Sequence, residues 1–367
     1  MDFLKASTSS KPEISIVIPV YNGGEKFRKC LASLDRPSPE VEVIVVDDHG
    51  SDHSWQLAKH FGAEVIRLPF NSGPAHARNA GAQIATGEIL FFVDADVAIH
   101  SDTIAQIIAE FRDRPRLAAL IGSYDDAPGA PNFLSQYKNL LHHYTHQTAS
   151  PEASTFWGAC GAIRRQIFLD IGGFDTAYRQ PSIEDIELGY RLKRSGYQIR
   201  LSKAIQVKHL KRWDALSLLK ADFFYRALPW TKLIHRDGKL INDLNLQTSS
   251  RVSVVAVYGL LAALIMALFG SGWGLVALNV AGIYALALLI LNAPVYQFLR
   301  HKRGLWFALQ SLPWHWLYYA YSGLAFAIGT LQHHLIRLNG CSQTSAQIKS
   351  LEPVLSHLAP LSSAGKK

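Results

Sequence analysis

Short apolar runs alternate with amphipathic stretches along the first part of the chain. Four runs rich in β-branched residues fall within residues 13–22, 40–48, 63–69 and 88–97, and polar residues follow each of them. Stretches with the apolar spacing of helices stand between them. Continuous apolar strands that alternate with helices are typical of a mostly parallel sheet covered by helices on both faces. The pattern therefore predicts an α/β domain.

The polar residues lie where the predicted strands end. In chain order they are Tyr21 and Asn22, Asp47 and Asp48, Asn71 and Ser72, and Asp94 and Asp96. Ligands of open α/β sheets bind beyond the carboxyl ends of the strands. Because four successive strands deliver polar groups to the same edge, we expect one binding site there.

Asp94 and Asp96 are candidate ligands for a cation. Side chains two residues apart in an extended chain point the same way, so the two carboxylates can share one ion. Hard oxygen ligands suit Mg²⁺ or Mn²⁺, and a substrate diphosphate could complete the shell. In the alternative, one aspartate caps the following turn and the other is solvated. The pair by itself leaves both interpretations open.

The order of the motifs resembles that of family-2 glycosyltransferases of the GT-A fold. The motifs read ISIVIPVYN, VVDDHGSD, NSGPAHARN and VDAD, and the later segments 157–175 and 184–197 resemble the acceptor-side half. His49 stands where glycine is usual. The resemblance spans residues 13–230 and implies a Rossmann-like, mostly parallel sheet covered by helices, followed here by a helical transmembrane region. It also implies an enzyme that uses a nucleoside-diphosphate sugar.

The resemblance assigns a donor site and a metal site. The expected nucleotide-sugar contacts are Pro19, Tyr21, Asn22, Asp47, Asp48, Arg78 and Asp94. The expected ligands of Mg²⁺ or Mn²⁺ are Asp94, Asp96 and His209. The residue types alone also allow Tyr21 and Asn22 as turn residues, Arg78 as a surface helix charge, and His209 as a structural histidine.

Ser182 to Gly196 has the apolar spacing of a helix, with Ser182 as a good N-cap and Gly196 as a stop. By resemblance Asp185, paired with Glu184, would take the proton of an acceptor hydroxyl as it attacks the anomeric carbon with inversion. Alternatively, the acids of this segment only complement the positive helix N-terminus. If the acceptor is itself a phosphate, no base is required and Asp185 would orient it.

The expected acceptor-side residues are Trp157, Gly158, Arg226 and Trp230. Residues 219–230 put aromatics on one side, which predicts an amphipathic element along the membrane surface or, alternatively, domain packing. The Gln-x-x-Arg-Trp motif of processive polysaccharide synthases is missing here, which argues against long-chain polymerisation. The three histidines within residues 141–148 could bind a metal, but an acceptor-side helix is the favoured interpretation.

Two uncharged apolar blocks, Val252–Phe269 and Trp273–Leu291, are each about as long as a bilayer-spanning helix. The Gly-Ser-Gly link between them predicts a tight hairpin. A third block, Leu305–Leu331, is apolar but contains polar residues and Pro313, so it could be a kinked span or a re-entrant segment. We therefore expect two or three membrane spans.

Lysine and arginine flank the first two blocks, at Lys232, Arg236, Lys239 and Arg251 before them and within residues 300–303 after them. The positive-inside rule places both flanks, and with them the catalytic domain, in the cytoplasm. The polar start of the chain does not look like a signal peptide. We expect a multi-pass membrane protein, in the inner membrane if the source is bacterial.

The net charge of +8 fits anionic lipid headgroups and a phosphorylated substrate. Basic residues are not interleaved with stacking aromatics, so nucleic acid is not an expected partner. Cys30, Cys160 and Cys341 match no disulfide or zinc spacing, which indicates reduced thiols.

We divide the chain into five parts. They are a flexible N-terminus (1–12), a GT-A catalytic domain (13–230, donor half about 13–100, acceptor half about 101–230), a juxtamembrane linker (231–251), a transmembrane region (252–331) and a C-terminal tail (332–367). The favoured function is inverting sugar transfer to a lipid or lipid-linked hydroxyl acceptor at the cytoplasmic membrane face. Transfer to polyprenyl phosphate is the alternative, and a non-catalytic membrane-anchored scaffold that binds nucleotide sugars is the alternative of another class.

Overall fold

The computed structural model describes residues 11–238, 244, 247–270 and 272–356, with side chains described as far as residue 336. Most of the predicted N-terminal segment 1–12 lies outside the described residues. Parts of the predicted linker 231–251 and tail 332–367 also lie outside them.

One mixed sheet forms the centre of the catalytic domain, in the order β3-β2-β1-β4-β8-β6-β9-β5, with β7 paired to β9. The strands are β1 (Ile14–Val20), β2 (Val41–Asp47), β3 (Glu64–Arg67), β4 (Ile89–Val93), β5 (Val97–Ile99), β6 (Ala119–Tyr124), β7 (Glu152–Ala153), β8 (Cys160–Arg164) and β9 (Ile199–His209). The first four pair in parallel, as the apolar pattern predicts. β8 is antiparallel to both β4 and β6, so the acceptor half joins the sheet through a reversed strand.

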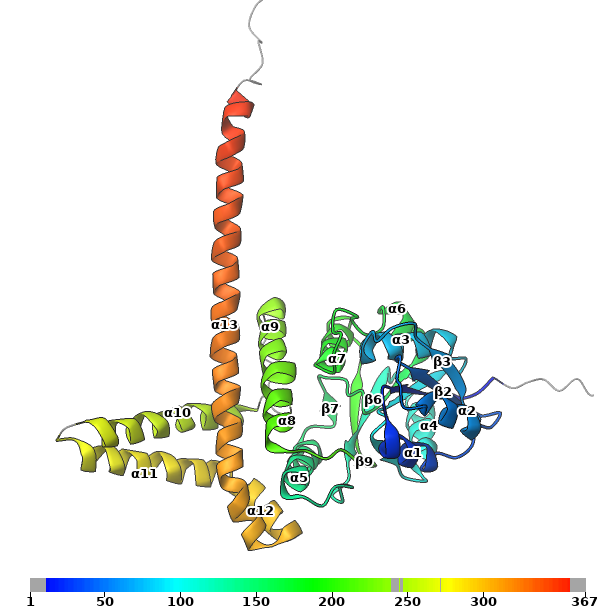
Figure 1. Ribbon diagram of the computed structural model, residues 1–367, viewed down its shortest axis with the longest axis horizontal. Coiled ribbons are helices and arrows are strands. Elements are labelled where there is room, and N and C mark those ends of the chain that lie inside the picture. The colour runs from blue at the N-terminus through cyan, green and yellow to red at the C-terminus, as the bar shows by residue number, and fades with distance from the viewer. Residues whose placement is uncertain (1–10, 239–243, 245–246, 271, 357–367) are drawn as a thin grey trace, which may run out of the picture.

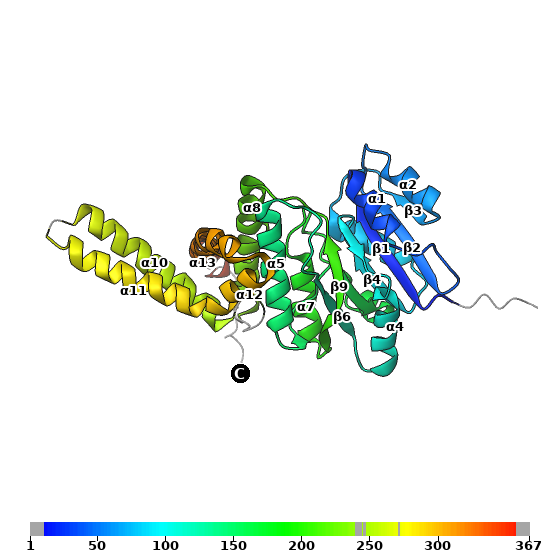
Figure 2. The ribbon, with the colours of Figure 1, turned by 90° about the horizontal axis from the view of Figure 1, so that it is seen from below.

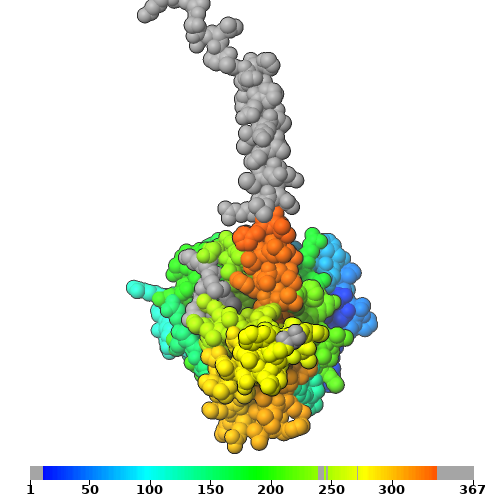
Figure 3. Space-filling model, turned by 90° about the vertical axis from the view of Figure 1, so that its left-hand side faces the viewer, coloured from blue at the N-terminus to red at the C-terminus, as the bar shows by residue number. Residues whose placement is uncertain are grey.

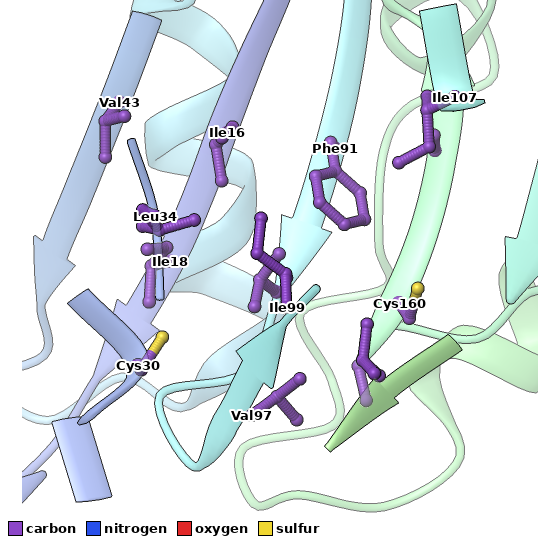
Figure 4. Packing of buried hydrophobic residues seen from close by; sticks show 14 of the residues in the cluster. Ile16, Ile18, Cys30, Leu34, Val43, Phe91, Val97, Ile99, Ile107 and Cys160 are labelled. Atoms are coloured by element: carbon purple, nitrogen blue, oxygen red, sulfur yellow. The ribbon is translucent and has the colours of Figure 1, made fainter. Parts of the chain in front are cut away.

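Helices cover both faces of the sheet (Figure 2). One face carries α1 (Gly24–Ala32), α2 (Ser54–Phe61) and α4 (Thr103–Asp113), and the other carries α3 (Pro74–Ile84), α6 (Arg165–Asp170) and α7 (Glu184–Arg194). Successive strand residues point to opposite faces, which is why Ile16 and Phe91 join one core while Val17 and Phe92 join the other. Figure 4 shows part of the first core.

The thiols Cys30 and Cys160 are buried in that first core and form no disulfide (Figure 4). Burial raises the pKa of the Cys160 thiol to about 12. Both cysteines therefore act as small apolar core residues.

Further helices lie at the end of the sheet opposite β3 (Figure 1). They are α5 (Phe133–Thr148), α8 (Ala215–Lys220), the π-helix η1 (Ala221–Ala227), α9 (Leu228–Asp237), α10 (Thr248–Phe269), α11 (Gly274–Leu291), α12 (Ala293–Arg303) and α13 (Leu305–Ser356). The helices α8, η1 and α9 follow one another without a break.

The helices α10 and α11 form the predicted hairpin, which projects away from the catalytic domain (Figure 1). Within the described residues, they are the two helices that are long and apolar enough to cross a membrane. In the most apolar 18-residue stretch of each helix, only 28% of α10 and 17% of α11 is buried within the protein. Figure 3 views the outer end of this hairpin, with the catalytic domain behind it.

The third apolar block behaves differently from the prediction. It is the first part of the continuous helix α13, which stands across the α10–α11 hairpin and beside α9 (Figure 1). Two of its polar side chains, Ser311 and His315, are buried, whereas Gln310 is exposed. The His315 ring lies 4.8 Å from that of Tyr319 and 6.4 Å from that of Tyr137 in α5. His315 therefore contacts α5 through Tyr137, while the Ser311 hydroxyl donates to the Phe307 carbonyl within α13.

Candidate active site

One continuous cavity of about 1460 Å³ lies between the carboxyl ends of the central strands and the C-terminal helices. Its lining begins at the ends of β1 and β2, passes the N-terminus of α7, and reaches α10 and α13. Of the predicted site residues, Asp47 and Gly158 are outside the lining.

The end of β1 forms the wall around Pro19, Tyr21 and Asn22. Tyr21 is 56% exposed into this space. Asn22 adopts a positive φ of 50°, and its Oδ1 accepts hydrogen bonds from the backbone N–H of Ser51 (2.7 Å) and from the Ser51 hydroxyl (3.3 Å). Asn22 therefore ties the end of β1 to the loop after β2 and leaves the Tyr21 ring as the exposed surface.

The neighbours Asp47 and Asp48 have different environments. Asp47 is fully buried, where it accepts from Gly50 N (3.0 Å) and Arg67 Nε (3.1 Å) and holds the turn after β2. Asp48 lines the cavity, and its two oxygens accept from Ser72 N (2.7 Å) and Gly73 N (2.9 Å). Asp48 thus fixes the loop that begins α3.

Arg78 joins the two halves of the domain. Its Nη2 donates to Asp94 Oδ1 at 2.6 Å, and its Nη1 donates to Glu184 Oε1 at 2.9 Å. Burial acts to lower the pKa of Arg78, but the two carboxylates more than offset it, so the pKa lies above its ordinary value. The other oxygen of Glu184 accepts from Ser182 N at 2.8 Å, so both Glu184 oxygens are occupied.

Asp94, Asp96 and His209 meet because of strand pairing. β5 runs antiparallel to β9 with Val97 opposite His209, which puts His209 Nε2 4.0 Å from Asp96 Oδ2. Burial, with Lys211 nearby, lowers the pKa of His209 to about 3, so the imidazole is neutral. The ring stacks on Tyr124 at 4.3 Å.

These three side chains fit a divalent cation that also binds substrate oxygens. Two carboxylates and a neutral imidazole are suitable donors for Mg²⁺ or Mn²⁺. In the described part of the chain, no three His, Cys, Asp or Glu side chains converge closely enough to hold an ion by themselves. One Asp94 oxygen is also engaged by Arg78. A cation here would therefore need further oxygen ligands, such as those of a diphosphate.

Asp185 stands at the start of α7, whose first turn also carries Glu184 and Glu187. Its Oδ2 accepts from Gly158 N at 3.0 Å, and its Oδ1 accepts from Ile186 N at 2.8 Å. Burial, followed by the charge of Glu184, raises the pKa of Asp185 to about 7 despite these hydrogen bonds. A carboxylate with a raised pKa, open to a cavity, is suited to accept a proton near neutral pH.

The predicted N-cap of this helix is wrong. Residue Ile183 precedes the helix without a side-chain cap, and the Ser182 hydroxyl instead donates to the carbonyl of Tyr225 in η1 at 2.7 Å. The competing acceptor on η1 is invisible in the local sequence. The helix does end as predicted, with Gly196 at a φ of 82° after Ser195.

Two protein-family models match the N-terminal part of the chain. Residues 15–172 match "Glycosyl transferase family 2", and residues 139–213 match "N-terminal domain of galactosyltransferase". The catalytic domain belongs to the family-2 glycosyltransferases of the GT-A fold. The two matched ranges together include the strands, the Asp94–Asp96 pair, Asp185 and His209.

Individual curated proteins also resemble this chain, at low sequence identity. The pre-mycofactocin glycosyltransferase of Mycobacterium tuberculosis is 27% identical over 230 residues, 60% of this chain and 47% of the relative. The 4,4'-diaponeurosporenoate glycosyltransferase of Staphylococcus haemolyticus is 29% identical over 123 residues, 32% of this chain and 33% of the relative. The chain thus spans less than half the length of these curated relatives.

A solved structure supports the fold. A mannosyltransferase from Pyrobaculum calidifontis in complex with GDP-Man and Mn²⁺ has a TM-score of 0.56 and 18% identity, over 86% of this chain and 87% of its own. At this level of identity the likeness establishes the shared GT-A architecture.

The predicted acceptor-side residues lie among aromatic side chains. Trp157 packs against Tyr124, His142 and His146, with ring centroids 4.7, 4.8 and 5.2 Å apart. Trp230 Nε1 donates to the Tyr190 hydroxyl at 3.0 Å, which joins α9 to α7. Gly158 is confined, since an added Cβ would lie 3.1 Å from Arg78 Cζ.

Several lining residues escaped the sequence reasoning. They are Tyr124, Lys138, Lys211 and Asp222. Lys138 and Asp222 form an ion pair across 84 residues of chain, so no local spacing could reveal it. For Tyr124, its place at the end of β6 was an available signal.

Proposed function

We propose that this chain is an inverting glycosyltransferase that moves a sugar from a nucleoside-diphosphate sugar to a hydroxyl of a lipid or lipid-linked acceptor at the cytoplasmic membrane face. One observation carries the proposal: Asp94, Asp96 and the half-buried Asp185 open into a single cavity that continues to the apolar helices α10 and α13. The donor and acceptor groups can therefore meet in one space.

The donor would lie at the carboxyl ends of β1, β2 and β4. Tyr21 offers an exposed ring for the base, and Asp48 fixes the loop beside it. Asp94, Asp96 and His209 would hold Mg²⁺ or Mn²⁺ together with the diphosphate, and Mn²⁺ and GDP-Man in the Pyrobaculum neighbour support this choice. A bound cation offsets the negative charge of the leaving diphosphate.

Asp185 would act as the general base. The acceptor oxygen attacks the anomeric carbon from the side opposite the diphosphate and forms the new C–O bond. Its proton passes to Asp185 Oδ, while the bond to the diphosphate breaks and its electron pair leaves with the diphosphate. One displacement inverts the anomeric configuration.

Arg78 and Glu184 would be positioning residues. Arg78 holds one oxygen of Asp94, and Glu184 holds Arg78 from the far side. The Glu184 side chain also fixes the backbone before α7 through Ser182 N. Together they would set the distance between the metal acids and the base.

The membrane and the lipid acceptor are proposed from the helical end of the cavity. The most apolar 18-residue stretches of α10 and α11 have a mean hydropathy of 2.5 and 2.3, and most of each stretch is not buried within the protein. The Staphylococcus haemolyticus relative is named a 4,4'-diaponeurosporenoate glycosyltransferase, and this name is compatible with an apolar acceptor.

The test is a screen of nucleoside-diphosphate sugars on the full chain in lipid nanodiscs, measuring nucleotide release and labelled lipid product. We expect release with one donor, its loss on chelation, its recovery with Mn²⁺ or Mg²⁺, and its loss in Asp96→Asn. Donor binding without turnover under any metal would favour the scaffold alternative. Full transfer to a hydroxyl acceptor by Asp185→Asn would refute the base assignment.

A further inference from the structure

The long helix α13 leaves one apolar side uncovered. Five large apolar side chains on this side are between 41% and 72% exposed: Trp306, Leu309, Leu317, Leu324 and Leu331. Their spacing places them on one side of the helix, because an α-helix turns once every 3.6 residues or about 100° per residue. We call this side the outer face of α13.

The opposite side of α13 packs against protein. Ser311, His315 and Tyr319 are buried on it, and His315 lies about half a turn from Leu317. The His315 ring is 6.4 Å from the ring of Tyr137 in α5. The N-terminal domain and the α10–α11 hairpin lie on opposite sides of α13 in both Figure 1 and Figure 2. The outer face therefore points to the side into which the hairpin projects.

The hairpin and α13 stand crosswise, so the two do not cross a bilayer together (Figure 1). Their crossing is tightly packed: the Tyr258 hydroxyl of α10 donates to the Ala320 carbonyl at 2.7 Å, and a Cβ added to Gly323 would lie 2.6 Å from Tyr258 Cε2. Among the described residues, α10 and α11 are the helices that are long and apolar enough to span a membrane. With the hairpin inserted along its own axis, α13 lies in the membrane plane.

The composition of α13 suits the surface of a bilayer. Residues 304–336 contain no Asp, Glu, Lys or Arg, so contact with lipid would not bury a charge. They include three Trp and three Tyr, which are enriched at the membrane–water interface. Arg300 and Arg303 precede this stretch, and Arg337 follows it. A helix that lies flat keeps these cations on one side of the membrane, as the positive-inside rule favours, whereas a spanning helix would separate them.

The candidate active-site cavity opens beside the outer face. Val255 of α10 and Leu324 and Ala327 of α13 belong to its lining. Val255 is 70% exposed and Leu324 is part of the outer face, so both side chains border the cavity and the surroundings of the protein. A molecule held at the bilayer surface can therefore reach the cavity between α10 and α13.

We propose that the outer face of α13 rests on the lipid bilayer, with the helix axis in the membrane plane and the α10–α11 hairpin inserted in the hydrocarbon core. This orientation holds the cavity opening between Val255 and Leu324 at the level of the lipid headgroups. The inference rests on the membrane association that forms part of the proposed function, but it does not require catalysis.

Depth-dependent fluorescence quenching of the full chain in phosphatidylcholine liposomes tests this orientation. A Cys341→Ser chain is the background, because Cys30 and Cys160 are buried and therefore shielded from labelling. An environment-sensitive fluorophore is attached to one new cysteine at a time, and the lipids carry a quencher either beside the headgroup or at the chain end. The ratio of the two quenching efficiencies gives the depth of each label.

Leu309→Cys, Leu317→Cys and Leu331→Cys place labels along the outer face. About 33 Å of helix separate the first position from the last, close to the thickness of the hydrocarbon core, about 30 Å. We expect the headgroup quencher to act at least about twofold more strongly than the chain-end quencher at all three positions, because an interfacial helix sits shallowly. A spanning α13 would instead give the strongest chain-end quenching at Leu317, and that result would overturn the proposal.

Three further labels complete the experiment. The label of Ile283→Cys, midway along α11 at a position that is 66% exposed, should be quenched most strongly by the chain-end quencher. The label of Asp113→Cys, at the exposed end of α4, should not be quenched. The label of Leu324→Cys reports on the cavity opening, and the headgroup quencher should act on it as strongly as on the Leu317 label.

Three other patterns would also overturn the proposal. Quenching at Ile283 without quenching on the outer face would mean that protein, such as a second copy of the chain, covers this face. No quenching at Ile283 would refute the membrane association and the orientation with it. An unquenched Leu324 label would show that the cavity does not open to lipid. If the expected pattern holds while no donor supports transfer, the catalytic part of the proposed function fails and the orientation of α13 stands.

Discussion

The sheet and the α10–α11 hairpin are built from similarly apolar residues but place them oppositely. In β1 all seven residues are buried, and Phe92 of β4 packs against Phe156, Phe168 and Phe174 at ring distances of 6.2, 5.1 and 5.1 Å. In the hairpin, Val255 and Ile265 are 70% and 59% exposed. The N-terminal domain buries its apolar residues internally, whereas the hairpin leaves many of its apolar side chains exposed within the described residues.

The two regions also differ in the polar side chains that they contribute to the cavity. The polar groups of the catalytic domain are held by named partners at one edge of the sheet, while the helical region contributes mainly apolar walls and cations to the same cavity. Pairs of substitutions, one in each region, test whether the two regions differ in this way.

The largest effect is expected for Asp185→Asn. Loss of the general base should lower the turnover number about 10²- to 10⁴-fold while donor binding changes little. Single-turnover transfer with a hydroxyl acceptor measures it. Asp113→Asn, at the exposed end of α4, is the matched control and should behave as the parent chain. Equal activity of the two variants would remove Asp185 from the mechanism.

Phe92→Ala and Ile265→Ala compare the two apolar regions directly. Truncation of Phe92 leaves a cavity among three aromatic rings and should lower the free energy of unfolding by about 3–5 kcal/mol. Truncation of exposed Ile265 should cost less than about 0.5 kcal/mol in detergent. Chemical denaturation followed by fluorescence measures both. Similar losses would mean that the hairpin is packed like a core.

Ile265→Lys examines the hairpin in a membrane. A lysine at the centre of a spanning helix costs about 3 kcal/mol of insertion free energy, and Ile265 lies near the end of α10, where the cost is smaller. The fraction of membrane-inserted chain should therefore fall moderately. A glycosylation-reporter assay measures the inserted fraction, with the Ile265→Ala chain as the reference. Unchanged insertion would argue that this face of α10 does not contact lipid.

The pH dependence follows from the raised pKa of Asp185. Because the base must be ionised, turnover should fall about tenfold per pH unit below about pH 7, and this limb should vanish in Asp185→Asn. The folded chain binds this proton more tightly than the unfolded chain, whose aspartate pKa is about 3.9. The linked stabilisation is therefore present at low pH and is lost as the pH rises to about 7. A rate profile with no acidic limb would contradict the assignment.

The smallest effect is expected for Gly158→Ala. The added methyl would stand 3.1 Å from Arg78 Cζ, so the guanidinium must shift and turnover should fall about three- to tenfold. Gly282→Ala in α11 is the matched control, because nothing lies within 4 Å of its added Cβ. Equal turnover in the two variants would show that Arg78 tolerates displacement.

Much of the architecture was predictable from local pattern. The β-branched runs predicted the parallel strands, and their polar ends predicted one site at the sheet edge, because strand periodicity and parallel pairing follow from short-range rules. The two uncharged blocks likewise predicted α10 and α11. In the third block, the burial of His315 and Ser311 could not be predicted, because hydropathy along the chain does not reveal contacts with distant segments.

The sequence by itself determined the fold class, the family and the types of residue at the site. Only the tertiary structure decided what each of them touches. It separated Asp47, which holds a turn, from Asp48, which lines the cavity. It joined Arg78 to both Asp94 and Glu184, and it gathered two cations around Asp222. The physical reason is that strand and helix patterns depend on neighbours along the chain, whereas charge pairing and burial depend on side chains brought together from distant segments.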